Sequence, residues 1–150
     1  MIEVATSMNQ LNLSQLAAVY QQSCQHSGMW EMFDYLRYDF FPVGGSLYCL
    51  RKDGFYVSAL RLEPYRDGFL LTALETAPDQ RGRGFARELM IGVLAMVEGK
   101  VYSHIDARNL ASIAVHKACG FEKILDHAVY LDGSVSTRAG TYLRFMQNDK

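Results

Sequence analysis

A glycine-rich turn separates a strand-like apolar run from a long amphipathic helix pattern, and it constrains the fold more than any other segment. Residues 69–74 are mostly apolar, as in a buried strand, and the turn Pro-Asp-Gln-Arg-Gly-Arg-Gly-Phe-Ala follows at residues 78–86. Beyond the turn, apolar residues recur at the spacing of one helix face at Phe85, Leu89, Val93 and Val97. The sequence therefore predicts a strand, a tight turn and a helix in direct succession.

The turn also has the chemistry of an anion site. A helix start carries four N–H groups without intrahelical partners, and the helix dipole adds partial positive charge there. Gly82 and Gly84 would let a phosphate approach the backbone closely, and Arg81 and Arg83 add formal positive charge. The sequence has neither the G-x-G-x-x-G dinucleotide fingerprint nor the Gly-Lys-Ser/Thr of a P-loop. We therefore expect a phosphate-bearing ligand of another kind.

Composition limits the classes of protein that fit. The chain has 150 residues, 49% of them hydrophobic and 21% charged, which predicts a single globular domain over residues 1–150. A net charge of −1 argues against a nucleic-acid partner. The three cysteines lack the spacing of a disulfide framework or a metal site, so no metal is expected. Without a signal-peptide pattern or an apolar run of about 20 residues, we expect a cytoplasmic protein that binds no membrane.

Two helices are expected in the N-terminal part. A helix pattern begins at Asn12 and stops at Ser27-Gly28. Residues 30–41 are rich in aromatic side chains and predict a short helix or lid, which Pro42 breaks. Aromatic residues at helical spacing belong more often to a core than to a binding site, so we expect most of this segment in the core.

The remaining patterns predict a mixed α/β fold. Asp53-Gly54 supplies the tight turn of a hairpin between strands at residues 46–51 and 55–61. After the glycine-rich turn the pattern changes to strand, helix and strand. We expect a strand at 101–105, a helix from Asn109 to Cys119 that Gly120 ends, and strands at 122–131 and 137–145.

Two motifs in the C-terminal half resemble those of the GNAT N-acetyltransferase superfamily. The R-x-x-G-x-G/A signature for acyl-CoA is matched at Arg81, Gly84 and Ala86. The segment N-x-x-[SA]-x-x-x-Y-x-x-x-G-F is matched at Asn109, Ser112, Gly120 and Phe121. His116 stands where the superfamily usually has tyrosine.

The resemblance implies a central, mostly antiparallel mixed sheet, flanked by about four helices, whose fourth and fifth strands splay apart. The pantetheine arm of acetyl-CoA would enter the gap, and the pyrophosphate would lie on the glycine-rich turn. The implied cofactor-binding residues are Leu74, Thr76, Arg81, Gly82, Arg83, Gly84, Phe85, Ala86, Asn109 and Ser112.

The implied reaction is direct transfer of the acetyl group to an amine. It needs a base for the amine proton and an acid for the leaving thiolate. In many relatives a glutamate lies twelve positions before the tyrosine, and these positions hold His104 and His116 here. Histidine, with a pKa of about 6.5, could serve in either role. The alternative is that both are structural, in a strand and on a helix face. Glu75 is a third candidate for base or acceptor binding, with a structural salt bridge as its alternative.

The function implied is an acetyl-CoA-dependent N-acetyltransferase that acts on a primary amine of a small molecule or peptide. Since the tyrosine is missing, a non-catalytic acyl-CoA-binding sensor of the same fold is the alternative. In the aromatic segment, Glu31, Asp34 and Asp39 could attract a cationic amine or form a solvated face. Relatives often form homodimers through the last strands, where Tyr130 and Tyr142 could contribute.

Overall fold

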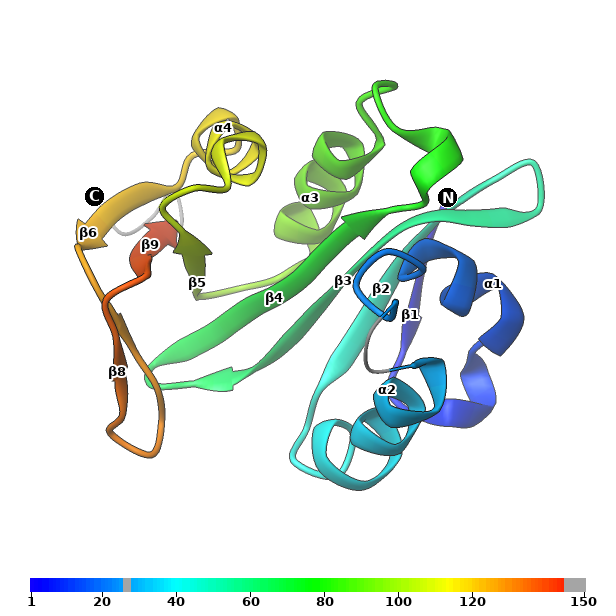
Figure 1. Ribbon diagram of the computed structural model, residues 1–150, viewed down its shortest axis with the longest axis horizontal. Helices are drawn as coiled ribbons and strands as arrows, with labels where there is room; N and C mark the ends of the chain where they lie inside the picture. The colour runs from blue at the N-terminus through cyan, green and yellow to red at the C-terminus, as the bar shows by residue number, and fades with distance from the viewer. Residues whose placement is uncertain (26–27, 145–150) are drawn as a thin grey trace.

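A seven-stranded mixed sheet forms the centre of the molecule (Figure 1). The computed structural model describes residues 1–25 and 28–144. The strand order is β1-β2-β3-β4-β5-β9-β6, and β4 and β5 are parallel while the other neighbours are antiparallel. The strands are β1 (Ile2–Ala5), β2 (Ser46–Lys52), β3 (Phe55–Tyr65), β4 (Gly68–Thr76), β5 (Lys100–Asp106), β6 (Glu122–Leu125) and β9 (Ala139–Arg144). A separate ribbon pairs β7 (Ala128–Val129) with β8 (Val135–Ser136).

Four α-helices cover the two faces of the sheet, as expected (Figure 1). One face carries α1 (Leu13–Val19) and α2 (Met29–Tyr35), the latter continued by the π-helical turn η2 (Leu36–Phe40). The opposite face carries α3 (Phe85–Met96) and α4 (Leu110–Ala118). Short 3₁₀ turns lie at η1 (Met8–Gln10) and η3 (Pro78–Gln80). None of the helices in the described residues combines the length and apolar character that crossing a bilayer requires.

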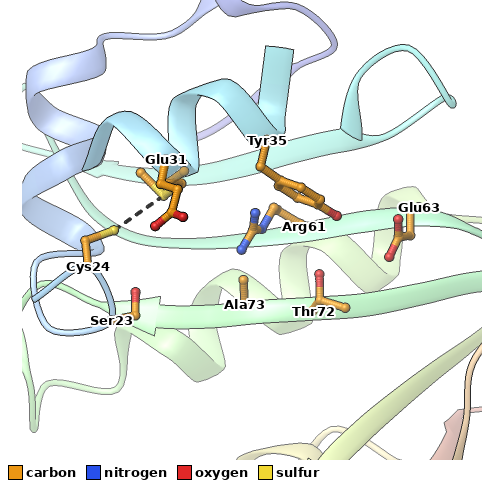
Figure 2. Close-up of a pocket in the computed structure, with 9 residues that line it drawn as sticks. Ser23, Cys24, Glu31, Tyr35, Arg61, Glu63, Thr72 and Ala73 are labelled. Atoms are coloured by element: carbon orange, nitrogen blue, oxygen red, sulfur yellow. Dashed lines mark hydrogen bonds between the residues drawn. The ribbon is translucent and has the colours of Figure 1, made fainter. Parts of the chain in front are cut away.

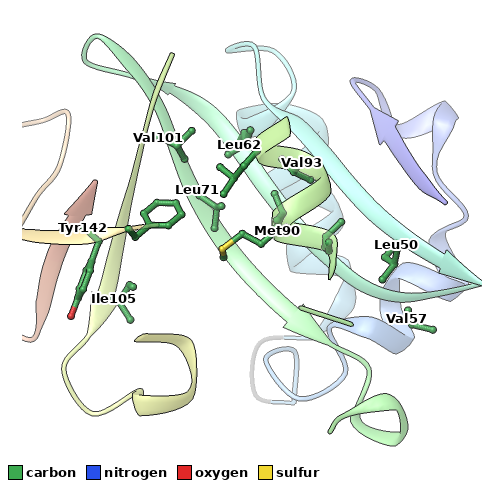
Figure 3. Packing of buried hydrophobic residues seen from close by; sticks show 13 residues of the cluster. Leu50, Val57, Leu62, Leu71, Met90, Val93, Val101, Ile105 and Tyr142 are labelled. Atoms are coloured by element: carbon green, nitrogen blue, oxygen red, sulfur yellow. The ribbon is translucent and has the colours of Figure 1, made fainter. Parts of the chain in front are cut away.

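Each face of the sheet has its own hydrophobic core, because side chains alternate along the central strands. Leu60 and Leu62 of β3 pack with Leu89 and Val93 of α3 (Figure 3 shows this cluster). On the other face Ala59 packs with a second cluster, which includes Leu16, Val19, Phe33, Leu36 and Phe40 of α1, α2 and η2. Phe33 and Phe40 of the aromatic segment thus belong to the core, but Trp30, Tyr35 and Tyr38 are exposed, so the expectation that most of the segment lies in the core is wrong.

A β-bulge bends β4 away from β5. Arg61 of β3 faces Thr72 while Ala59 faces Glu75, so β4 contains one extra residue between these pairs. Ala73 has a φ of +53°, a left-handed conformation that costs an alanine about 1–2 kcal/mol. The hydroxyl of Tyr20 donates a hydrogen bond to the Ala73 carbonyl at 2.7 Å and fixes the bulge. The parallel pairing with β5 ends at Leu71, so the two strands splay beyond it.

Several elements differ from the sequence expectation. The first helix ends at Val19, earlier than its apolar pattern predicts, and Ser27 of the expected stop lies outside the described residues. The single strand expected at 122–131 is two short strands, because β7 turns away to pair with β8. The sequence did not indicate β1.

The C-terminal strand forms as expected, but one of the two tyrosines considered for dimer contact is buried. The strand expected at 137–145 is observed as β9, and Phe145 lies outside the described residues. Tyr142 on this strand is buried in the core, whereas Tyr130 is 41% exposed. Tyr142 is therefore not available for contact with another subunit.

Candidate active site

Two adjoining cavities open where β4 and β5 separate. A cavity of about 200 Å³ lies in the gap itself, lined by residues 71–74 of β4, residues 103–106 of β5 and the α4 side. A cavity of about 620 Å³ lies between the end of β4, the glycine-rich turn and α4. Leu74, Asn109 and Ser112 line both cavities. The gap is therefore continuous with a larger space beside the turn.

Six of the ten predicted cofactor residues line the larger cavity. They are Leu74, Thr76, Arg81, Ala86, Asn109 and Ser112. The Arg81 guanidinium is held by the side-chain oxygen of Gln22, and the Asn109 side chain accepts a hydrogen bond from the Ser112 N–H at 3.1 Å. Residues from three separate elements thus converge on one space.

The glycine-rich turn presents an open backbone at the start of α3. Gly82 and Gly84 have φ values of +78° and +77°, which favour glycine over other residues. A Cβ atom added at either position would meet no heavy atom within 4 Å. The N-terminus of the twelve-residue helix α3 begins directly after Gly84. Positive φ and open space together fit a turn that a phosphate group can approach.

Arg83 and Phe85 point elsewhere. Both line a separate cavity of about 550 Å³ beside the β2–β3 hairpin. The Arg83 guanidinium donates to the Gln80 side chain at 3.3 Å, and the Lys52 ammonium lies 5.7 Å from the centre of the Phe85 ring. At Arg83 and Phe85 only the backbone, and not the side chain, could contact a ligand in the cavity of about 620 Å³.

Glu75 lies in the larger cavity, near the turn. The Ser23 hydroxyl donates to its carboxylate at 3.1 Å, and no lysine or arginine nitrogen of the described residues lies within 4.0 Å of it. Burial raises the pKa of Glu75, and the bond from Ser23 and the charge of Arg81 oppose this only in part. The carboxylate is therefore not tied up in a close ion pair and is easier to protonate than an exposed glutamate.

His104 lies in the gap cavity on β5, half-buried between two aromatic rings. The Tyr65 hydroxyl donates its hydrogen to the Val129 carbonyl, so at the 3.4 Å contact with His104 the Nε2–H must be the donor. Nδ1 then keeps a free lone pair. Burial lowers the pKa of His104, with a smaller contribution from the charge of Arg66. Burial thus favours the neutral form of the ring.

His116 lies on α4 and is only 2% exposed. Its Nδ1 lies 2.7 Å from the Ser112 carbonyl, which can only accept, so Nδ1 carries the hydrogen. Its Nε2 lies 3.0 Å from the Ser103 hydroxyl, which also lies 3.3 Å from the Leu71 carbonyl. Burial lowers the pKa of His116, although the bond to Ser112 acts in the opposite direction. Both ring nitrogens are therefore engaged.

The two histidines approach the gap from opposite faces of β5. Ser103 and His104 are consecutive, so their side chains point to opposite sides of the strand. The Ser103 side meets His116 on α4, whereas the His104 side meets Tyr65 and Tyr130. A group placed in the gap would have one imidazole on each side.

A fourth cavity lies on the face that α1 and α2 cover (Figure 2). It has a volume of about 510 Å³ and includes Glu31 and Tyr35 of α2. Thr72 and Ala73 line both this cavity and the gap, so the two cavities adjoin at the bulge of β4. Asp34 and Asp39 lie on the same helical segment but are exposed and do not line this cavity.

The sequence relationship agrees with this geometry. Residues 11–121 match the profile of the Acetyltransferase (GNAT) family, which is most of the chain. The chain belongs to the GNAT acetyltransferase family. No curated protein sequence matches it significantly.

Solved structures of GNAT acetyltransferases share the fold over nearly the whole chain. The ribosomal-protein-alanine N-acetyltransferase of Brucella melitensis is 20% identical, with a TM-score of 0.70, and the match covers 97% of this chain and 99% of that one. The IAA acetyltransferase of Bacillus cereus is 14% identical, with a TM-score of 0.68 and the same coverage. A GNAT family acetyltransferase of Elizabethkingia anophelis with acetyl-CoA bound is 12% identical, with a TM-score of 0.69 and 97% coverage of both chains.

Sequence reasoning missed several residues of this GNAT site. Tyr65 and Ser103 contact the two histidines, and Tyr20 holds the bulge through Ala73. These contacts join distant segments, so no local motif could reveal them. Across residues 1–25 and 28–144, no group of three or more His, Cys, Asp or Glu side chains is placed to hold a metal ion.

Proposed function

We propose that this GNAT protein transfers the acetyl group of acetyl-CoA directly to a primary amine of a small molecule or peptide. The observation that carries the proposal is the gap between β4 and β5. It shares lining residues with the cavity beside the glycine-rich turn and with the cavity beside α2. A cofactor and an acceptor could therefore meet at one point from two sides.

Acetyl-CoA is proposed to lie with its pyrophosphate on the turn and its pantetheine arm along β4. The N–H groups of residues 81–86, the start of α3 and Arg81 supply positive potential for the phosphates. Beyond Leu71 the edge of β4 that faces β5 has no strand partner among the described residues, so its backbone groups are free to pair with pantetheine. Asn109 and Ser112 border both cavities and would lie along the arm.

His104 is proposed as the base. An amine that arrives as an ammonium must lose a proton before its nitrogen can attack the thioester carbonyl. The neutral ring with a free Nδ1 can accept that proton directly or through water. The nitrogen then forms a bond to the carbonyl carbon, the carbon–sulfur bond breaks, the nitrogen gives up its second proton to become the amide, and the sulfur leaves as a thiolate that takes up one proton. Backbone N–H groups on the unpaired edge of β4 could stabilise the oxyanion between these steps.

The leaving sulfur is proposed to depart on the α4 side. His116 could act as the acid only if Nε2 carried a proton, and burial lowers its pKa. Its contacts support a positioning role instead, in which it orients the Ser103 hydroxyl at the point where the strands part. Glu75 lies on the cofactor side of the gap and is the second candidate for the base.

A non-catalytic acyl-CoA sensor is the second candidate function. It is favoured by one observation, which is that the imidazole in place of the family's tyrosine has both nitrogens occupied by protein groups. Such a protein would bind CoA without consuming its thioester.

Thiol release from acetyl-CoA tests the proposal when it is measured against polyamines, amino acids, aminoglycosides and peptides with free N-termini. We expect at least one class of amine to be acetylated, with one free CoA formed per acetylated product. Calorimetric titration with CoA runs in parallel. CoA binding without turnover on any amine would favour the sensor, and absence of CoA binding would contradict both functions.

A further inference from the structure

Arg61, in the middle of the sheet, is a cation that has no ion-pair partner among the described residues. Its Nε is buried and has no hydrogen-bond partner, and the described residues place no carboxylate within ion-pair distance of the guanidinium. The guanidinium carbon lies 5.4–5.9 Å from the ring centres of Tyr20, Tyr35 and Phe40. Aromatic faces hold a cation in place but accept no hydrogen bond in the plane of the guanidinium. Its donors therefore remain free for a ligand.

The guanidinium lies in the cavity beside α2, next to the gap. Arg61 faces Thr72 across the β3–β4 pair, one residue before the bulge at Ala73. Both Thr72 and Ala73 also line the gap between β4 and β5. A group bound by Arg61 is thus close to the point at which the acceptor nitrogen must attack.

The same cavity contains two carboxylates. In Figure 2, Glu31 lies toward one end of the cavity and Glu63 toward the other, with Arg61 between them. Burial raises the pKa of Glu63, and the positive charge of Arg61 opposes this in part. One half-buried cation and two separate anions complement a molecule that carries both a carboxylate and an ammonium group.

We propose that the acceptor is a small amine that carries a carboxylate, as a free amino acid does, and that Arg61 binds this carboxylate. The proposal rests on the acetyl transfer proposed above and specifies its acceptor. A planar guanidinium with free N–H groups matches a carboxylate through two parallel hydrogen bonds. Glu31 and Glu63 attract the ammonium group, which loses its proton at the gap. The volume of about 510 Å³ suits an acceptor of the size of a single amino acid.

Matched acceptors test this without any mutation. Each L-amino acid of a panel is compared with its own amide and its decarboxylated amine, and kcat/KM is expressed per neutral amine. We expect removal of the carboxylate to lower kcat/KM by about tenfold to a hundredfold, mainly through KM. Equal or better use of the amine without a carboxylate would overturn the proposal and leave acetyl transfer intact, as would activity confined to peptides.

Variants of Arg61 test whether this residue causes the preference for acceptors that carry a carboxylate. Arg61→Gln should reduce the preference for the carboxylate to about unity while the KM for acetyl-CoA changes less than twofold. Arg61→Lys retains the charge and the folded core and should keep part of the preference. Arg138→Gln removes an exposed arginine outside the cavity and serves as the matched control. A preference that persists in folded Arg61→Gln would overturn the assignment.

Binding measurements can test the carboxylate site even if the protein acetylates no amine. If no amine is acetylated, calorimetry of the CoA complex with an N-acetyl amino acid and with its amide still reports on the cavity. Tighter binding of the carboxylate form that Arg61→Gln abolishes would support the carboxylate site. Equal binding of the two forms would overturn it.

Discussion

Gly84→Glu, compared with Gly84→Ala, separates the charge of the glycine-rich turn from its backbone strain. At φ +77° any side chain costs about 1–2 kcal/mol, but a Cβ atom there meets no heavy atom within 4 Å. Both variants should therefore melt about 2–8 °C below the wild type. A carboxylate at the start of α3 interacts favourably with the helix dipole, so Gly84→Glu should be no less stable than Gly84→Ala.

Binding of CoA should distinguish the two variants sharply. A carboxylate about 5 Å from one pyrophosphate charge, at an effective dielectric constant of about 20, is repelled by about 3 kcal/mol, which is more than a hundredfold in Kd. Calorimetric titration with CoA and thermal unfolding of the same samples give both quantities. If Gly84→Glu bound CoA as tightly as Gly84→Ala, the turn would not be the pyrophosphate site.

Three further predictions concern the helix α4 and the two histidines. His104→Gln should lower kcat/KM by about a hundredfold or more without changing the Kd for CoA, and an unchanged kcat/KM would transfer the role of base to Glu75. His116→Gln should flatten the dependence of Tm on pH. Burial lowers the pKa of His116 in the folded protein below the unfolded value of about 6.5, so the unfolded chain binds the proton first. As the pH falls below about 6.5, the wild type therefore loses up to about 1.4 kcal/mol of unfolding free energy per pH unit. Equal slopes between pH 7.5 and 5.5 would contradict the buried neutral state. Asn109→Ala removes the cap that binds the Ser112 N–H and should cost about 1 kcal/mol of unfolding free energy, a loss that Asn109→Asp should largely avoid in chemical denaturation.

The parts of the fold that depend on local chemistry could be predicted from the sequence. Asn109 caps α4 as expected, and the hairpin forms around Asp53-Gly54, where both residues have positive φ. At the glycine-rich turn the chain changes direction before α3, which the positive φ of Gly82 and Gly84 allows. In each case neighbours in the sequence determine the conformation.

The features that depend on distant contacts could not be predicted in this way. Ala73 adopts a left-handed conformation although alanine disfavours it, because the buried Tyr20 hydroxyl binds its carbonyl from 53 positions away. The resemblance to the GNAT motifs makes His104 and His116 candidates, but only the fold reveals that each approaches the gap from a different face of β5.

A crystal structure with a non-reactive thioether analogue of acetyl-CoA tests the central claim most directly. We predict that the pyrophosphate lies against the N–H groups of residues 81–86 and that the acyl carbonyl lies in the gap beside Ala73, with His104 on one side and His116 on the other. An analogue bound in another cavity, or one whose acyl group lies outside the gap between β4 and β5, would contradict the account.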